Sequence, residues 1–266
     1  METIISTLYV VSHYSCNLDC PHCDIHKINS NYEELIFLDR LRNINANKTV
    51  LFGGEPLLYQ NTFTKIVETN KIDSVSTNLL LLNDYYIKYI EDYNLGVATS
   101  WNPKRFTKQQ ESIWIENLSK VNCDILITLT DDLISNEGTN QLLEMLNKIK
   151  DIKTINCVKF EQEVNESLTK EHFENVDDWL CKISKNWSYE FSNEIAERVK
   201  DWKCNCSKVM TLEPNGTLRK GCPQYYKTLF LDECLKCSLN SICQPCVLQK
   251  ECSFPKKLYK QVIGNE

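Results

Sequence analysis

The sequence predicts an α/β fold built around a parallel sheet. Between residues 7 and 160, short apolar runs of strand length alternate with longer stretches whose apolar residues recur every three or four positions. Strands that alternate with helices form right-handed βαβ units, which place the strands parallel in one sheet. Hydrophobic residues make up 42% and charged residues 25% of the 266 residues, which is the composition of an ordinary globular protein.

Six runs rich in Val, Ile, Leu or Thr predict buried parallel strands. They occupy residues 7–14, 48–52, 72–77, 95–101, 124–130 and 152–160. Helical periodicity is clearest where Leu35, Leu38 and Leu41 follow one another at intervals of three. The predicted helices are 32–44, 57–69, 83–92, 107–121 and 138–150. Six strands are about two fewer than a full barrel needs, and periodicity alone leaves an open doubly wound sheet and a partial barrel as alternatives.

The number of cysteines, 14, is unusual for a chain of this composition. No export signal is recognised at the N-terminus, so we expect a cytoplasmic protein, in which clustered cysteines are metal ligands more often than disulfides. A disulfide framework is the alternative. No apolar run approaches the length of a membrane span, and a net charge of −6 gives no overall attraction to nucleic acid.

The first cluster, Cys16-x3-Cys20-x2-Cys23, follows the first predicted strand. Three thiolates from one loop can hold a [4Fe–4S] cluster and leave one iron open to a ligand from outside the protein. An open metal position is what distinguishes a catalytic site from a structural one. A zinc site is the alternative. The histidines available as its fourth ligand are His13, His22 and His26.

A second motif, Gly53-Gly54-Glu55-Pro56, ends the second predicted strand. Parallel α/β folds bind ligands at this carboxyl edge of the sheet. Glycines let the backbone approach a ligand closely, and we expect the Glu55 carboxylate to pair with a ligand ammonium group. The alternative is a tight strand-to-helix turn that binds nothing.

Together, the cysteine triplet and the Gly-Gly-Glu-Pro motif resemble the radical S-adenosylmethionine (SAM) superfamily. The resemblance implies a partial (β/α)6 TIM-type barrel in which Cys16, Cys20 and Cys23 hold a [4Fe–4S] cluster that binds SAM at its open iron. One electron then cleaves SAM, and the resulting 5′-deoxyadenosyl radical removes a hydrogen atom from the substrate.

The resemblance also implies which residues contact SAM. His22 takes the position near the adenine, and residues 53–56 hold the methionine moiety. Asn78 belongs to a signature after strand three in which Leu79 replaces the usual glycine, and Ser100 belongs to a signature after strand four from which Asn102 and Pro103 depart. The implied SAM-binding residues are His22, Gly53, Gly54, Glu55, Pro56, Asn78 and Ser100.

Eight further cysteines crowd into the last 63 residues and resemble the SPASM extension of this superfamily. Pro214-Asn215-Gly216 predicts a hairpin turn between two short strands, since Asn-Gly suits positive φ angles. The resemblance implies two auxiliary [4Fe–4S] clusters, whereas shortened spacings leave a single cluster open, and a zinc ribbon is the alternative for this segment alone. One cluster would use Cys204, Cys206, Cys222 and Cys246, and the other Cys234, Cys237, Cys243 and Cys252.

The expected organisation is therefore a radical SAM partial barrel (1–163), a helical bridge (164–203) and a small Cys-rich α+β domain that binds clusters (204–266). The barrel offers three weaker catalytic candidates. Cys157, in the last strand, is a candidate hydrogen-atom donor or a buried core residue. Asp131 and Asp132, after strand five, are candidate general bases or a solvated turn.

The SPASM resemblance favours peptide modification by thioether or carbon–carbon crosslinking, or by epimerisation. Cys222 is followed by Pro223, which counts against sulfatase maturation because those relatives carry Asp there. Expected partners are a peptide substrate, a flavodoxin or ferredoxin as reductant, and a separate leader-peptide-binding protein, since only 15 residues precede Cys16. The alternatives are a dehydrogenase of a small alcohol or amino sugar, and a non-enzymatic electron carrier or zinc-stapled interaction module.

Overall fold

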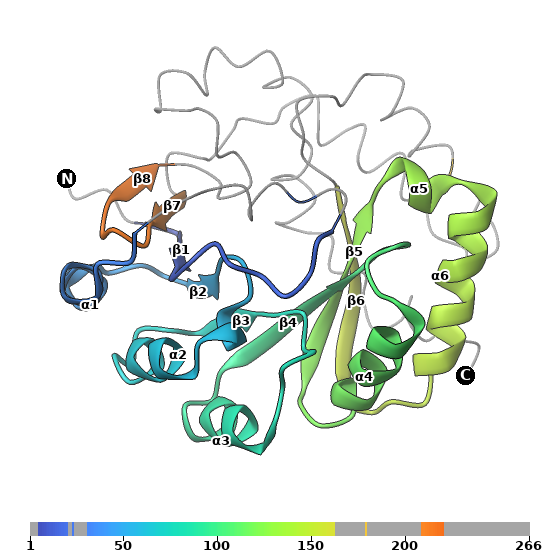
Figure 1. Ribbon diagram of the computed structural model, residues 1–266, viewed down its shortest axis with the longest axis horizontal. Coiled ribbons are helices and arrows are strands. Elements are labelled where there is room, and N and C mark those ends of the chain that lie inside the picture. Colours follow the sequence, from blue (N-terminus) through green and yellow to red (C-terminus); the bar gives the residue numbers. More distant parts are fainter. Residues whose placement is uncertain (1–4, 21–22, 24–30, 163–178, 180–208, 221–266) are drawn as a thin grey trace, which may run out of the picture.

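A computed structural model describes residues 5–20, 23, 31–162, 179 and 209–220 (Figure 1). His22, most of the predicted bridge and the eight cysteines of the C-terminal segment lie outside these residues.

The six predicted strands are present, and all of them are parallel within one sheet. They are β1 (Thr7–Val11), β2 (Thr49–Phe52), β3 (Ser74–Ser76), β4 (Gly96–Trp101), β5 (Cys123–Leu129) and β6 (Ile155–Gln162). Each strand pairs with the next one along the chain, so the strand order never reverses. These six strands lack the reversal of order that marks the switch point of a doubly wound sheet, and the expectation of an α/β fold of partial-barrel type is confirmed.

Helices follow one another around the outside of the sheet (Figure 1). They are α1 (Glu34–Asn43), a 3-10 turn (Pro56–Leu58), α2 (Gln60–Val67), α3 (Asp84–Asp92), α4 (Lys108–Leu118), α5 (Asp131–Ile134) and α6 (Asn136–Ile149). Helix α6 begins two residues before the predicted start because the Ser135 hydroxyl accepts a hydrogen bond from the Gly138 amide (3.0 Å) and caps the helix.

Large apolar side chains fill the space between the helices and the sheet. Phe37 of α1, Phe63 of α2 and Trp114 of α4 are at most 1% exposed. The Trp114 indole N–H donates to the Thr99 hydroxyl oxygen (3.0 Å). This hydrogen bond satisfies the one polar group of the side chain, which would otherwise be buried without a partner. Burial of each such side chain stabilises the fold by about 1.5–3 kcal/mol, so the helices are fixed against the sheet mainly by this layer.

The predicted hairpin is also present, as β7 (Val209–Leu212) and β8 (Leu218–Lys220). Gly216 at its turn has a φ of 78°, as the Asn-Gly pair predicts. Strand β7 pairs in parallel with β1, so the hairpin extends the barrel sheet to the order β6-β5-β4-β3-β2-β1-β7-β8. The first strand of the chain is therefore an interior strand.

No helix in the described part of the chain is long and apolar enough to cross a membrane.

Candidate functional site

The sequence motifs meet at the carboxyl edge of the sheet. Cys16 follows the end of β1 by five residues, Gly53–Pro56 follow β2, and Thr77 and Asn78 follow β3. Because the strands are parallel and adjacent, these segments come together at the edge where folds of this kind bind ligands.

The Gly-Gly-Glu-Pro motif is hydrogen-bonded to the segment that leads into the first cysteine. The Gly54 amide donates to the His13 carbonyl oxygen (3.0 Å), and the Glu55 amide donates to the Ser15 carbonyl oxygen (2.9 Å). A Cβ atom on Gly53 would lie 2.6 Å from the His13 oxygen, and one on Gly54 would lie 2.0 Å from the Ser15 oxygen. The two glycines are thus required for contact with residues 13–15, and they fix the path of the chain toward Cys16.

The Glu55 carboxylate is buried and faces the protein. It is 1% exposed, and its Oε1 accepts hydrogen bonds from the Thr77 hydroxyl (2.6 Å) and the Leu57 amide (3.0 Å). Its Oε2 accepts from the Asn78 amide (2.7 Å). Burial raises the pKa of this carboxyl, and the three hydrogen bonds oppose the rise. In this structure its hydrogen bonds connect the end of β2 to the end of β3. The expected pairing with a ligand ammonium group stays a prediction.

Asn78 links β3 to the cysteine loop. Its side chain is 3% exposed, and its Nδ2 group donates to the Asn17 Oδ1 atom (2.7 Å) and lies 4.0 Å from the Cys16 sulfur. Its Oδ1 atom accepts from the Leu80 amide (3.0 Å). The next residue, Leu79, has a φ of 62°, which explains why glycine suits this position in the superfamily signature.

The three cysteines of the first cluster lie in one loop. Cys16 and Cys23 are half-buried and Cys20 is buried, and the Cys23 amide donates to the Cys20 carbonyl oxygen (3.0 Å). Burial raises the pKa values of Cys16 and Cys20. The Leu18 amide, 3.4 Å from the Cys16 sulfur, opposes this rise for Cys16. Within the described ranges, no three His, Cys, Asp or Glu side chains are grouped closely enough to hold a metal ion.

A cationic residue, Arg105, lies near these thiols. Its positive charge acts to lower the pKa values of Cys16, Cys20 and Glu55. Its guanidinium carbon lies 5.4 Å from the centre of the Phe106 ring, and its buried Nε atom has no hydrogen-bond partner among the described residues. A positive charge beside a set of thiols favours their anionic form, which is the form that binds metal.

Three side chains of this site were not among the sequence-predicted site residues: Asn17, Thr77 and Arg105. Asn17 and Thr77 lie inside the recognised motifs, so the motifs did contain a signal for them. Arg105 lies two residues beyond the strand-four signature, and its proximity to the cysteines depends on how the β4–α4 connection folds.

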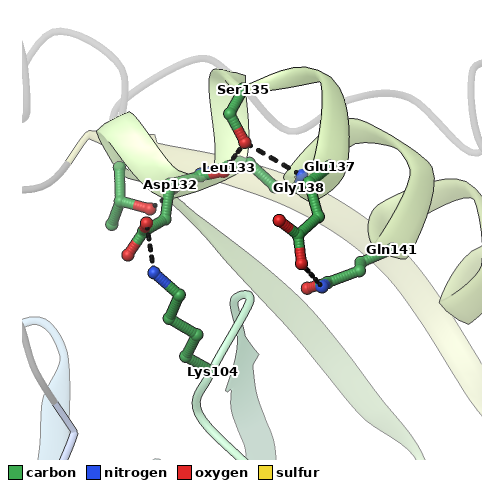
Figure 2. A network of polar contacts seen from close by, with 8 residues as sticks. Lys104, Asp132, Leu133, Ser135, Glu137, Gly138 and Gln141 are labelled. Carbon is green, nitrogen blue, oxygen red and sulfur yellow. Dashed lines mark hydrogen bonds and ion pairs between the residues drawn. The ribbon is translucent and has the colours of Figure 1, made fainter.

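The predicted residues beyond β4 occupy different places. Ser100 is half-buried near the carboxyl end of β4. Asp131 and Asp132 form the exposed first turn of α5, and Asp132 pairs with Lys104 at 2.6 Å (Figure 2). Cys157 lies near the amino end of β6 and pairs with Asp124 at the start of β5. This position is at the opposite end of the strands from the cysteine loop, which counts against a role for Cys157 as a hydrogen donor there.

The fold resembles the partial barrel of radical SAM enzymes over nearly the whole chain. One similar solved structure is anSMEcpe with bound AdoMet (TM-score 0.59, 17% identity, 97% of this chain and 95% of that chain). A second structure of anSMEcpe, with AdoMet and the Cp18Cys peptide, gives a TM-score of 0.58 at 17% identity over 96% and 95% of the two chains. Streptococcus suis SuiB bound to precursor peptide SuiA gives 0.57 at 14% identity over 99% and 68%. No protein-family model and no curated protein matches the sequence. At these identities, the similarity establishes the fold.

Proposed function

We propose that this protein is a radical SAM enzyme that modifies a peptide. The observation that carries the proposal is the hydrogen-bonded contact between the Gly-Gly-Glu-Pro backbone and the segment entering the cysteine triplet, at the carboxyl edge of a parallel sheet. This contact supports the proposal because it joins the segment that leads into Cys16 to the proposed methionine-binding segment, and solved structures with a similar fold contain AdoMet.

The side chains of the site suit an anionic iron–sulfur cluster. Cys16, Cys20 and Cys23 would be its ligands, the Leu18 amide points at the Cys16 sulfur, and the Arg105 charge offsets negative charge nearby. When bound, such a cluster supplies the electron that cleaves SAM into methionine and a 5′-deoxyadenosyl radical, which takes a hydrogen atom from the substrate. Residues 53–56 would hold the methionine moiety, and the Glu55 carboxylate, which joins the ends of β2 and β3, would pair with its ammonium group.

Ser100 and His22 complete the proposed SAM site. Ser100 stands near the end of β4, next to the strand that bears the Thr77–Asn78 segment, where its hydroxyl is available to a bound nucleoside. His22 follows Cys20 by two residues and is proposed to lie near the adenine on the ground of the motif alone.

The choice of a peptide as substrate rests on two supports. Structures with similar folds contain the Cp18Cys peptide and precursor peptide SuiA. The spacing of the eight C-terminal cysteines resembles that of the SPASM extension, for which we propose one or two auxiliary [4Fe–4S] clusters. A flavodoxin or ferredoxin would supply the electron, and a separate leader-peptide-binding protein is a further proposed partner.

Anaerobic reconstitution tests the enzymatic part of the proposal. The reconstituted full chain, given SAM and dithionite, should produce 5′-deoxyadenosine, and the Cys16→Ala variant should produce none above background. The iron content should approach about twelve atoms per chain with three cubane clusters, or about eight with two. Zinc in place of iron, or no 5′-deoxyadenosine from the wild-type protein, would overturn the proposal.

The peptide part requires its own measurement. The protein would be produced together with any short peptide that is encoded beside its gene, and the peptide would be analysed by mass spectrometry and chiral amino-acid analysis. A crosslink removes two hydrogen atoms from the peptide, whereas epimerisation leaves its mass unchanged and inverts one residue. Turnover of SAM with an unaltered peptide, together with oxidation of a small alcohol or amino sugar, would show that the substrate class is wrong.

A further inference from the structure

Both polar atoms of the Asn78 side chain make hydrogen bonds within the protein, where the cysteine loop begins. Its Oδ1 atom faces the Leu80 backbone N–H, which can only donate, so this atom is the oxygen and its partner atom is the nitrogen. The Nδ2 group then faces the Asn17 Oδ1 atom at 2.7 Å and the Cys16 sulfur at 4.0 Å.

The position of Asn78 is itself fixed from the other side. Its backbone N–H donates to the Glu55 carboxylate at 2.7 Å, and the neighbouring Thr77 hydroxyl donates to the same carboxylate at 2.6 Å. A continuous set of hydrogen bonds thus runs from the end of β2, through the end of β3, to the Cys16–Asn17 segment. Only a side chain that accepts through one atom and donates through another can complete this set, and at this length that side chain is asparagine.

The Cys16 sulfur has a second N–H group beside it, the Leu18 amide at 3.4 Å. Hydrogen bonds to the sulfur ligands are one of the means by which a protein sets the reduction potential of an iron–sulfur cluster. An N–H group stabilises the reduced cluster more than the oxidised one, because the reduced cluster carries more negative charge on its sulfurs.

We propose that Asn78 is a positioning residue for Cys16. Its Nδ2 group holds the Cys16–Asn17 segment against the end of β3 and, with the Leu18 amide, is directed at the sulfur of the first cluster ligand. Two consequences follow. The first, an ordered cysteine loop, requires no metal. The second, a less negative reduction potential of the cluster, rests on the proposed function.

Hydrogen exchange in the metal-free full chain tests the positioning role. Asn78→Asp keeps the acceptor for the Leu80 amide and loses the donor, and Asn17→Ala removes the acceptor at an exposed position whose loss leaves the core intact. Amides of residues 16–20 should exchange about twofold to tenfold faster in either variant, which is the range that the loss of one hydrogen bond gives. The effect should be confined to this loop, because a general folding defect would also speed exchange in β4 and β5.

A redox titration tests the effect on the cluster. In reconstituted Asn78→Asp protein, the one-electron couple of the site cluster should shift to a more negative potential, with an altered electron paramagnetic resonance spectrum. Asn83→Asp is the matched control: it makes the same chemical change at the start of α3, where Asn83 only accepts, from the Tyr85 and Tyr86 amides. This control should leave both the potential and the spectrum unchanged.

The outcomes separate the two claims. Unchanged exchange of residues 16–20 in both variants overturns the positioning role. Faster exchange with an unchanged potential in Asn78→Asp overturns the role in setting the potential. A wild-type protein that binds no iron cluster overturns the proposed function, while the exchange experiment still decides whether Asn78 orders the loop.

Discussion

Glu55 shows how one residue connects two elements of the site. Its carboxylate gathers donors from the turn that follows β2 and from the end of β3, so the two strand ends cannot move independently. The motif predicts that Glu55 lies at the carboxyl edge of the sheet, and the structure places it there. The direction of the side chain depends on where Thr77 and Asn78 lie, and spacing along the chain does not contain that information.

We expect Glu55→Gln to destabilise the protein by about 1–3 kcal/mol, because a glutamine amide turns one of its two acceptor atoms into a donor and leaves one buried donor unpaired. Urea unfolding of the variant measures this loss. Glu91→Gln, at an exposed carboxylate of α3, is the control and should change the free energy of unfolding by less than about 0.5 kcal/mol. Equal stability of the two variants would contradict the role given to the buried carboxylate.

The raised pKa of Glu55 predicts a pH dependence. A carboxyl whose pKa is higher in the folded than in the unfolded chain favours the folded state below its ordinary value of 4.5, and this contribution is lost as the pH rises through the raised pKa. The free energy of unfolding of the wild type, relative to that of Glu55→Gln, should therefore fall as the pH rises above 4.5. A relative stability that rises over the same range would show that the sign of the pKa shift is wrong.

A side chain at position 54 is excluded by a backbone atom, the Ser15 carbonyl oxygen, which cannot move aside as the end of a flexible side chain can. Gly54→Ala should cost at least about 1–3 kcal/mol, because its new methyl group would overlap the Ser15 carbonyl oxygen. The overlap would displace residues 13–15, which lead into Cys16, so the reconstituted variant should also retain less iron at the site. Gly96→Ala is the matched control, since its new carbon would meet the Ser74 Cβ atom at 3.3 Å. This variant should change the stability and the iron content less than Gly54→Ala does.

At the scale of elements, helix α4 orders the connection that carries Arg105. Its N-terminus has a capping box in which the Thr107 hydroxyl accepts from the Gln110 amide, while the Gln110 side chain accepts from the Thr107 amide. This start lies two residues after Arg105, so the cap also fixes the end of the turn that brings the guanidinium toward the cysteines.

Thr107→Ala should lower the free energy of unfolding by about 0.5–2 kcal/mol, the usual cost of removing such a cap. Thermal unfolding provides the measurement. Ser112→Ala is the control within the same helix, since its hydroxyl bonds back to the Lys108 carbonyl oxygen and contributes little to stability. If Thr107→Ala lowered the free energy of unfolding no more than Ser112→Ala does, the Thr107 cap would not explain the order of this turn.

The order of the strands and helices along the chain could be predicted from the sequence, whereas the first residue of each helix could be predicted less well. The six strands follow from apolar runs such as 124–130, and β5 (Cys123–Leu129) differs from its prediction by one residue at each end. The start of α6 was missed because Ser135 acts through a cap, which the period of the apolar residues does not reveal. The candidate site was predicted from its motifs, whereas Arg105 was not predicted because it belongs to no motif.

At the scale of the whole molecule, the hairpin that the sequence assigns to the Cys-rich segment is part of the barrel sheet. Leu212 of β7 is fully buried in the same core cluster as Leu8 and Val10 of β1. The division of the chain at residue 204 therefore follows the change in composition, whereas packing joins residues 209–220 to the barrel.

Because the hairpin and barrel share one core, Leu212→Ala should lower the stability of the barrel by about 2–5 kcal/mol. Leu142→Ala, a fully buried residue of α6, is the matched change within the barrel. Denaturant unfolding should show one shared transition displaced by a similar amount in both variants. A Leu212→Ala effect confined to a separate transition would instead indicate an independent C-terminal unit.

Among the described strands, β1 has a partner on each side, while β6 and β8 form the two ends of the sheet. Strands at the margin of a sheet separate most easily, since they are held along one side only. On gradual warming below the shared unfolding transition, local opening of backbone hydrogen bonds should therefore begin at β6 and β8. The residues that lead into the cysteine triplet should be among the last to lose their backbone contacts.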